Sequence, residues 1–444
     1  MGKTMEGKPV LNRQTFIQTF FTRNGSEKPS VSTEVIAGVT TFLTMAYIIF
    51  VNPTILASTG MDKTALTGVT CLVSGIVTIL TGLVANAPIA MAPGMGLNAY
   101  FAYILVANQH VPWPVALGIV FLSGLVFLLL TWAGFRTKLV EAIPHDLLNA
   151  IAVGIGVFIA FIGLQNMGLV IKNDVTFVSG GPLNRHVLIG LAGLLCMILL
   201  EIKKVKGSML IGIGLATVLS LMVGDIVFPV LIFPFKFSLS PVFGKIDILG
   251  ALKVSFLAPI FTLMFMDLFD SIGSLLGLAK EANMVDSNGK IPKLSTLLSL
   301  DAFASMFGAV CGTSTTTAYI ESASGIESGG RTGLTSVVTG ILFLLALMFV
   351  PVFAIVPANA TAPALLMVGF FMMGNIKAID FKNPEIGFPS FLIIILIALC
   401  YSISTGLAFG FLSYTLIKVF RGKVKEISPV LWLINMLCLL FFVV

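Results

Sequence analysis

Apolar runs recur along this chain from Val35 to Phe420, each roughly the 17 to 25 residues that an α-helix needs to cross a bilayer. Only 10% of the residues are charged, whereas water-soluble domains carry about 25%. Such a chain has too little polar surface to cover itself in water. We therefore predict an all-α polytopic membrane protein.

The apolar runs divide into fourteen expected transmembrane segments. They cover residues 33–56, 67–86, 88–108, 114–133, 147–168, 186–202, 207–230, 254–279, 295–312, 314–330, 332–356, 360–375, 388–404 and 405–420. With a cytoplasmic N-terminus, 20 of the 26 Lys and Arg residues fall on the cytoplasmic side, as the positive-inside rule requires. We therefore expect a multi-pass protein of the cell membrane (the inner membrane in a bacterium). The polar tail 1–32 has no signal-peptide core and should stay in the cytoplasm.

Seven spans in each half is an odd number, so the second half must enter the membrane in the opposite orientation to the first. This pattern predicts a 7+7 inverted repeat. The last segment, 429–444, is apolar but short for a crossing. We expect it to form an interfacial or re-entrant helix after a basic loop.

The third span carries an interruption, Ala92-Pro-Gly-Met-Gly-Leu-Asn98. Proline cannot donate a backbone hydrogen bond, and glycine lets the backbone approach a ligand. We therefore expect a broken helix with a short strand, and a new helix that begins near Leu97. Asn98 would offer a donor and an acceptor in its first turn. The alternative is a kinked helix in which Asn98 binds a neighbouring helix.

The tenth span carries a corresponding interruption. Thr313–Thr317 is a hydroxyl-rich, β-branched run that favours a short strand. Tyr319 and Glu321 follow where the helix would resume. An ionisable residue at this depth costs at least about 2.5 kcal/mol on insertion scales, so a functional role is the first interpretation. A carboxylate satisfied by hydroxyls and amides, with a purely structural role, is the alternative.

The eighth span contains two acids, Asp267 and Asp270, spaced so that they share one helical face. Two carboxylates in a medium of low dielectric do not both ionise easily, and such a pair can bind and release a proton. An ion pair or a helix cap is the alternative for Asp267. Asp301, in the ninth span, is expected to be structural.

These motifs resemble those of the AzgA-like purine nucleobase permeases of the nucleobase/ascorbate transporter superfamily. The matching segments include Val51-Asn-Pro53, Ala92–Asn98, Leu268-Phe-Asp270, Ala318–Ser322 and Gly330-Arg-Thr-Gly333. The resemblance implies uptake of adenine, hypoxanthine or guanine by proton symport, in a carrier that is often a homodimer. It also implies a core domain that moves against a gate domain.

The implied domains follow the expected spans. The core comprises residues 33–133 (spans 1–4) and 254–356 (spans 8–11), and the gate comprises 134–230 (spans 5–7) and 357–420 (spans 12–14). An extracytoplasmic connection, 231–253, joins the two halves. Residues 421–444 form the basic loop and the short apolar C-terminal segment.

The resemblance also implies roles for individual residues. Glu321 would be the carboxylate that binds the purine, Asp270 its partner on span 8, and Asn98 the polar residue of span 3. Protons would be carried by Asp267, Asp270 or Glu321. In related uracil and xanthine carriers a histidine follows the span-8 acid, and here Ser274 takes its place. The other residues expected to line the substrate site are Thr41, Met95, Gly96, Tyr319 and Ile320.

Other functions fit less well. An anion transporter or an uncoupled facilitator of the same architecture remains an alternative, although Glu321 and Asp270 would repel anions. A membrane-embedded enzyme would need a metal or nucleophile constellation, and the sequence offers none. No cofactor and no metal are expected. Nucleic acid is not expected as a partner either, because the basic residues are dispersed among the loops. The sequence does not rank the three purines.

Overall fold

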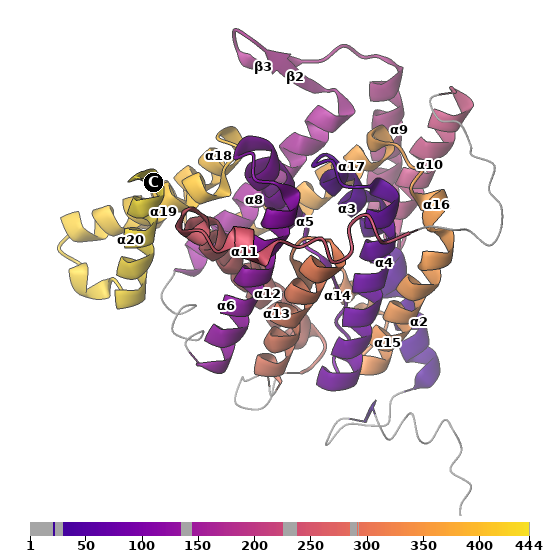
Figure 1. Ribbon diagram of the computed structural model, residues 1–444, viewed down its shortest axis with the longest axis horizontal. Coiled ribbons are helices and arrows are strands. Elements are labelled where there is room, and N and C mark those ends of the chain that lie inside the picture. Colours follow the sequence, from indigo (N-terminus) through magenta and orange to yellow (C-terminus); the bar gives the residue numbers. More distant parts are fainter. Residues whose placement is uncertain are drawn as a thin grey trace, which may run out of the picture.

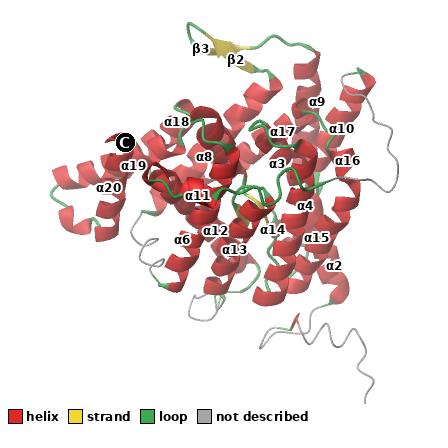
Figure 2. Cartoon of the chain, in the orientation of Figure 1, coloured by secondary structure: helices red, strands yellow, loops and turns green. Residues whose placement is uncertain are grey.

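The computed structural model describes residues 21–22, 30–134, 144–224, 238–284, 291 and 293–443. Within these residues the chain is a bundle of helices with two small sheets (Figures 1 and 2). Nine helical segments of this part are long and apolar enough to cross a membrane. Most of the tail 1–32 and part of the connection 231–253 lie outside the described residues.

The first half contains helical residues in each of the seven expected segments, and residues 225–230 of the seventh lie outside the described residues. Its elements are α2 (Val31–Met45), α3 (Ile48–Ala57), α4 (Lys63–Leu80) with the π-helix η1 (Thr81–Ala85), β1 (Met91–Pro93), α5 (Met95–Ala99) with the π-helix η2 (Tyr100–Asn108), α6 (Trp113–Trp132), α8 (His145–Met167), β2 (Val170–Asn173), β3 (Phe177–Gly180), α9 (Arg185–Ile202) and α10 (Ser208–Met222).

The second half begins with short elements and continues with long helices. Its elements are α11 (Ile248–Ala251), η3 (Val254–Phe256), α12 (Leu257–Glu281), α13 (Leu294–Cys311), β4 (Thr316–Ala318), α14 (Ser322–Glu327), α15 (Gly333–Ala346), η4 (Leu347–Phe349), α16 (Val350–Phe353), α17 (Ala358–Met373), η5 (Gly374–Ala378), α18 (Pro384–Leu399), α19 (Ile403–Phe420), η6 (Val424–Glu426) and α20 (Pro429–Val443).

The helices pack in two groups. In the first, α15 packs on α2 and α4, and α6 packs on α12 and α13. In the second, α17 packs on α8, α9 and α10, while α18 packs on α8 and α19. Each group therefore combines segments from both halves of the chain, as Figure 1 shows by the mixture of indigo or magenta with orange or yellow.

Glycine allows unusually close contact inside the first group. A Cβ atom added to Gly333, at the start of α15, would lie 1.9 Å from the backbone oxygen of Gly82. A Cβ atom on Gly82 would in turn lie 2.4 Å from the oxygen of Gly333. The two backbones therefore touch, as small residues permit in membrane helices.

The hairpin formed by β2 and β3 was not expected from the sequence. It is antiparallel, with Val170 opposite Gly180, and projects beyond the helix ends in Figure 1. Gly168 ends α8 in the left-handed conformation, with φ of 79°. The side chain of Asn173 then accepts hydrogen bonds from the backbone amides of Val175 and Thr176. A local turn therefore stabilises two strands that no apolar run had marked.

The C-terminal segment expected at 429–444 is the helix α20, which lies at the edge of the bundle (Figure 1). Its Asn435 is buried, and the side-chain amide donates to Thr415 Oγ1 of α19 at 2.7 Å. The helix is thus fastened to α19 by a polar contact. Its position relative to the bilayer stays a prediction.

Candidate functional site

Two strands from opposite halves of the chain pair at the centre of the molecule. β1 and β4 are antiparallel, with Met91 opposite Ala318 and Pro93 opposite Thr316, and every residue in both is buried. The pairing continues beyond the strands, because the Gly94 amide donates to the Thr315 carbonyl oxygen at 2.9 Å. The two interrupted segments therefore supply each other's backbone hydrogen-bond partners, as backbone buried in a membrane requires.

A helix begins shortly after each strand. α5 begins at Met95, two residues before the expected start, and Gly94 is its N-cap. α14 begins at Ser322, with Glu321 as its N-cap. The strand expected within 313–317 is found at 316–318. Both helices therefore begin at the strand crossing, where their first backbone amides lack partners within the helix.

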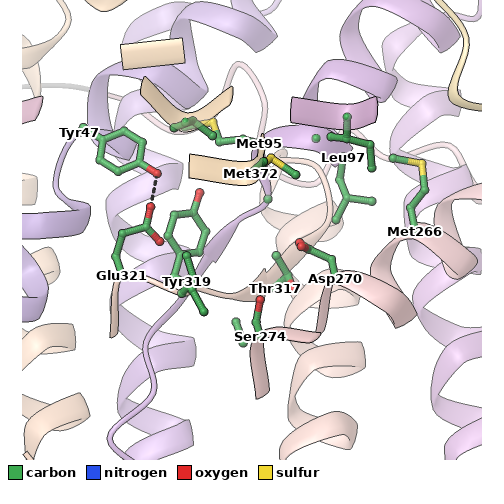
Figure 3. A pocket seen from close by; sticks show the side chains of 16 residues that line it. Tyr47, Met95, Leu97, Met266, Asp270, Ser274, Thr317, Tyr319, Glu321 and Met372 are labelled. Carbon is green, nitrogen blue, oxygen red and sulfur yellow. Dashed lines mark hydrogen bonds between the residues drawn. The ribbon is translucent and has the colours of Figure 1, made fainter. Parts of the chain in front are cut away.

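A cavity lies beside this crossing (Figure 3). Its lining residues are Tyr47, Gly94, Met95, Gly96, Leu97, Ile155, Met266, Asp270, Ser274, Thr317, Ala318, Tyr319, Ile320, Glu321, Val368 and Met372. The walls thus come from both strand–helix segments, from α12, and from α8 and α17 of the second helix group.

Glu321 enters the cavity from the start of α14. The phenol of Tyr47, from the junction of α2 and α3, donates to Glu321 Oε1 at 2.5 Å, which Figure 3 shows as a dashed line. The neighbouring Tyr319 turns its hydroxyl to the carbonyl oxygen of Pro93 at 2.6 Å. Tyr319 therefore fastens β4 to β1, while Glu321 presents its carboxylate to the cavity.

Close packing holds Glu321 in this place. A Cβ atom on Gly325 would lie 2.7 Å from the carbonyl oxygen of Ala37 and 2.0 Å from Thr41 Oγ1, both in α2. Only glycine lets α14 lie this close to α2. Thr41 itself is buried in this contact and does not line the cavity.

Asp270 approaches the cavity from α12, and its side chain is exposed there (Figure 3). Ser274, one turn further along α12, also lines the cavity. The described lining residues include two carboxylic acids and no Lys, Arg or His. The site is therefore rich in hydrogen-bond acceptors, and such a site suits a ligand with N–H donors.

Asp267 lies in a different environment from Asp270, despite their helical spacing. It is buried against α13, where the hydroxyl of Ser305 donates to Asp267 Oδ2 at 3.1 Å. Asp301 of α13 accepts from the hydroxyl of Ser271. The Ser271 and Thr317 hydroxyls are 2.9 Å apart. These two acids thus join α12, α13 and β4, whereas Asp270 faces the cavity.

Asn98 is fully buried and does not line the cavity. Its side-chain amide donates to Asn52 Oδ1 at 2.6 Å, and its carbonyl oxygen accepts from the hydroxyl of Ser314. Asn52 in turn donates to Thr313 Oγ1 at 3.2 Å. Asn98 therefore belongs to a polar network that connects α3 and α5 to the residues before β4. The structure thus combines the short strand and new helix of the first prediction with an Asn98 that binds a neighbouring helix, as in the alternative.

Sequence reasoning did not identify several cavity residues. Tyr47 had a detectable signal, since it is a polar residue within an apolar segment. Ile155, Val368 and Met372 had none, because an apolar residue on a helix faces lipid, core or cavity with the same sequence pattern. Of the expected lining residues, Met95, Gly96, Tyr319 and Ile320 do line the cavity together with Glu321 and Asp270.

Residues 32–409 match the model of a family described as the Permease family. The chain belongs to this family. The match runs from α2 into α19 and includes every residue of the cavity. The family comprises transporters, so the protein is a membrane permease and not an enzyme.

Curated relatives match over nearly their whole length. A putative permease of Methanocaldococcus jannaschii is 44% identical, with 93% of this chain and 94% of the relative covered. The adenine permease AdeP of Escherichia coli is 39% identical, with 92% of each chain covered. The guanine/hypoxanthine permease PbuG of Bacillus subtilis is 40% identical, with 93% and 97% covered. These relatives place the permease in the nucleobase/ascorbate transporter group.

Among solved structures, the transmembrane domain of the cyanobacterial bicarbonate transporter BicA aligns with a TM-score of 0.63 at 14% identity. The alignment covers 87% of this chain and 98% of that domain. At this identity the likeness shows a common fold only.

Proposed function

We propose that this permease takes up purine nucleobases by proton symport and that the cavity beside the strand crossing is the substrate site. The observation that carries the proposal is a cavity with two acids and no basic side chain among its described lining residues. Purines are planar and display several N–H groups, and carboxylate oxygens accept hydrogen bonds from such groups. Relatives named as adenine and as guanine/hypoxanthine permeases support the same substrate class.

The proposed transport cycle uses the two helix groups as moving bodies. The strand–helix segments and α12 belong to the core, residues 33–133 and 254–356. Ile155, Val368 and Met372 belong to the gate, residues 134–230 and 357–420. A substrate bound between them would change its access when the core moves against the gate, as in other inverted-repeat carriers. Asp270 and Glu321 would bind the purine, and these two or Asp267 would carry the proton.

This mechanism assumes the architecture expected from the sequence. Fourteen spans would form the 7+7 inverted repeat, and β1 and β4 would be the breaks in spans 3 and 10. The N-terminus would be cytoplasmic, and the carrier would form a homodimer.

An anion transporter is the second candidate, because the chain shares its fold with a bicarbonate transporter. Acidic side chains in the cavity would repel an anion, so we favour the purine.

Uptake measurements test the function. Cells that lack their own purine uptake should accumulate radiolabelled adenine, hypoxanthine or guanine when they express this chain, and a protonophore should reduce the accumulated amount to the equilibrium level. If untreated cells take up purine only to the equilibrium level, the protein is an uncoupled facilitator and not a proton symporter. Absence of uptake for all three purines, with bicarbonate or another anion transported instead, would contradict the proposal.

The two acids of α12 should behave differently. Asp270→Asn is expected to weaken purine binding about tenfold or more, because a hydrogen bond to a charged group is worth roughly 1.5–3 kcal/mol. Asp267→Asn should leave the dissociation constant within about twofold of the wild type, because Asp267 contacts Ser305 and not the cavity. Isothermal titration of the purified variants measures both values. Equal losses in the two variants would place the substrate elsewhere along α12.

A further inference from the structure

Glu321 lies at the start of a helix but does not cap it. It precedes α14, and its side chain makes no hydrogen bond to the first backbone amides of that helix. Those amides lack partners within the helix, and the N-terminal end of a helix attracts negative charge. A flexible glutamate at this position is therefore expected to turn back onto α14. In the structure it lines the cavity instead (Figure 3).

The phenol of Tyr47 explains this orientation. Its hydroxyl donates to Glu321 Oε1 at 2.5 Å, and Figure 3 draws that bond to one of the two carboxylate oxygens. A hydrogen bond to an ionised oxygen is roughly twice as strong as one between neutral groups. A carboxylate can accept several hydrogen bonds, so Glu321 can accept a further N–H while it stays bonded to Tyr47.

Tyr47 is held in place by the fold around it. Its side chain is 1% exposed, at the junction between α2, which ends at Met45, and α3, which begins at Ile48. α14 packs directly on α2, and the bond from Tyr47 joins the α2–α3 junction to the start of α14. A buried aromatic ring therefore holds an acid whose own side chain is flexible.

We propose that Tyr47 is a positioning residue for the substrate site: it holds the carboxylate of Glu321 in the orientation in which that acid accepts a purine N–H. This inference rests on the proposed function. Tyr47 acts through Glu321 and keeps its hydrogen bond when the purine binds. A purine that meets an acid already in place does not have to immobilise it, and the smaller loss of side-chain entropy appears as higher affinity.

Tyr47→Phe removes the hydroxyl and keeps the ring. Without the phenol the carboxylate can turn to the amides of α14, so binding has to bring it back. The dissociation constant of the best-bound purine should rise about fivefold, the effect of immobilising one flexible side chain. The KM of uptake should rise with it, while the maximal rate stays near that of the wild type. Isothermal titration of the purified, full-length carrier and uptake in cells measure these values.

A second background tests whether Tyr47 acts through the acid. Glu321→Asp keeps the charge but moves the carboxylate one methylene away from the phenol. Tyr47→Phe added to Glu321→Asp should therefore change the dissociation constant by less than about twofold. An equal loss in both backgrounds would mean that the hydroxyl contacts the purine itself or acts through the fold, and it overturns the positioning role. Unchanged or tighter binding in folded Tyr47→Phe overturns it as well.

Tyr401→Phe is the matched control. The Tyr401 hydroxyl donates to Gln165 Oε1 and does not line the cavity, so its loss should leave the purine affinity unchanged. Tyr47→Met, which also lacks a donor, replaces Tyr47→Phe if thermal unfolding shows that the latter does not fold. Absence of purine binding in the wild type contradicts the proposed function and is thereby distinguished from a failure of the role of Tyr47.

Discussion

Glu321→Gln is expected to reduce purine binding and uptake by at least about 100-fold. Glutamine has nearly the same shape, but it replaces one acceptor oxygen by an NH₂ donor and removes the charge. In the proposed site that donor would meet either the Tyr47 hydroxyl or the N–H groups of the purine. Loss of one hydrogen bond to a charged group and the mismatch of a second are together worth about 3 kcal/mol or more. Uptake of radiolabelled purine and titration of the purified variant measure the loss.

Glu327→Gln is the control for this experiment. It makes the same chemical change at the end of the same helix, where the side chain is 62% exposed and pairs with Lys206. Its uptake should equal that of the wild type, since surface ion pairs contribute little. If Glu321→Gln retained uptake while folded and present at wild-type levels, the carboxylate would not be the purine ligand.

Gly333→Ala is expected to destabilise the folded carrier strongly while leaving the chemistry of the cavity intact. The added methyl group would lie 1.9 Å from the carbonyl oxygen of Gly82. That atom belongs to the backbone and cannot move aside as a side chain can, so α15 would have to separate from the end of α4 and η1. Overpacking of this kind typically costs about 1–3 kcal/mol, and contact with backbone favours the upper end. Thermal unfolding in detergent measures the effect.

Gly277→Ala, in α12, provides the comparison, because no atom of the described residues outside its own stretch of helix lies within 4 Å of a Cβ atom there. Alanine favours a helix over glycine by about 1 kcal/mol, so this variant should unfold at the wild-type temperature or above it. Gly333→Ala that folds should still bind purine with the wild-type dissociation constant. A wild-type unfolding temperature for Gly333→Ala would show that η1 and α15 do not touch through Gly82 and Gly333.

The long helices could be predicted from the sequence because each apolar run has about the length that a helix needs to cross a bilayer. The strands could be located because Pro93 and the threonines before Ala318 disfavour helix. Their pairing with each other could not be read, since no local pattern links residues so far apart in the chain.

Residues of the cavity could be predicted where an acidic or polar residue interrupts an apolar segment. Glu321 and Asp270 are acids in apolar segments, and both line the cavity. Asn98 was equally out of place, yet its amide faces Asn52 and Ser314, because the direction of a side chain depends on tertiary packing. The partner of Glu321, Tyr47, is 274 residues away in sequence.

The crossing of β1 and β4 also constrains how the carrier is made. Tyr319 bonds to Pro93 across 226 residues, so a ribosome has released the first strand long before the second exists. Until then the carbonyl of Ala90 and the amide of Gly94 lack their partners Tyr319 and Thr315, whereas the backbone of Met91 can already bond to Thr78 of the first half. Each unsatisfied group in hydrocarbon costs several kcal/mol. The nascent first half therefore has to keep this segment away from lipid, in the translocation machinery or against its own helices. The carrier can transport only after the second half has been synthesised and β4 has paired with β1.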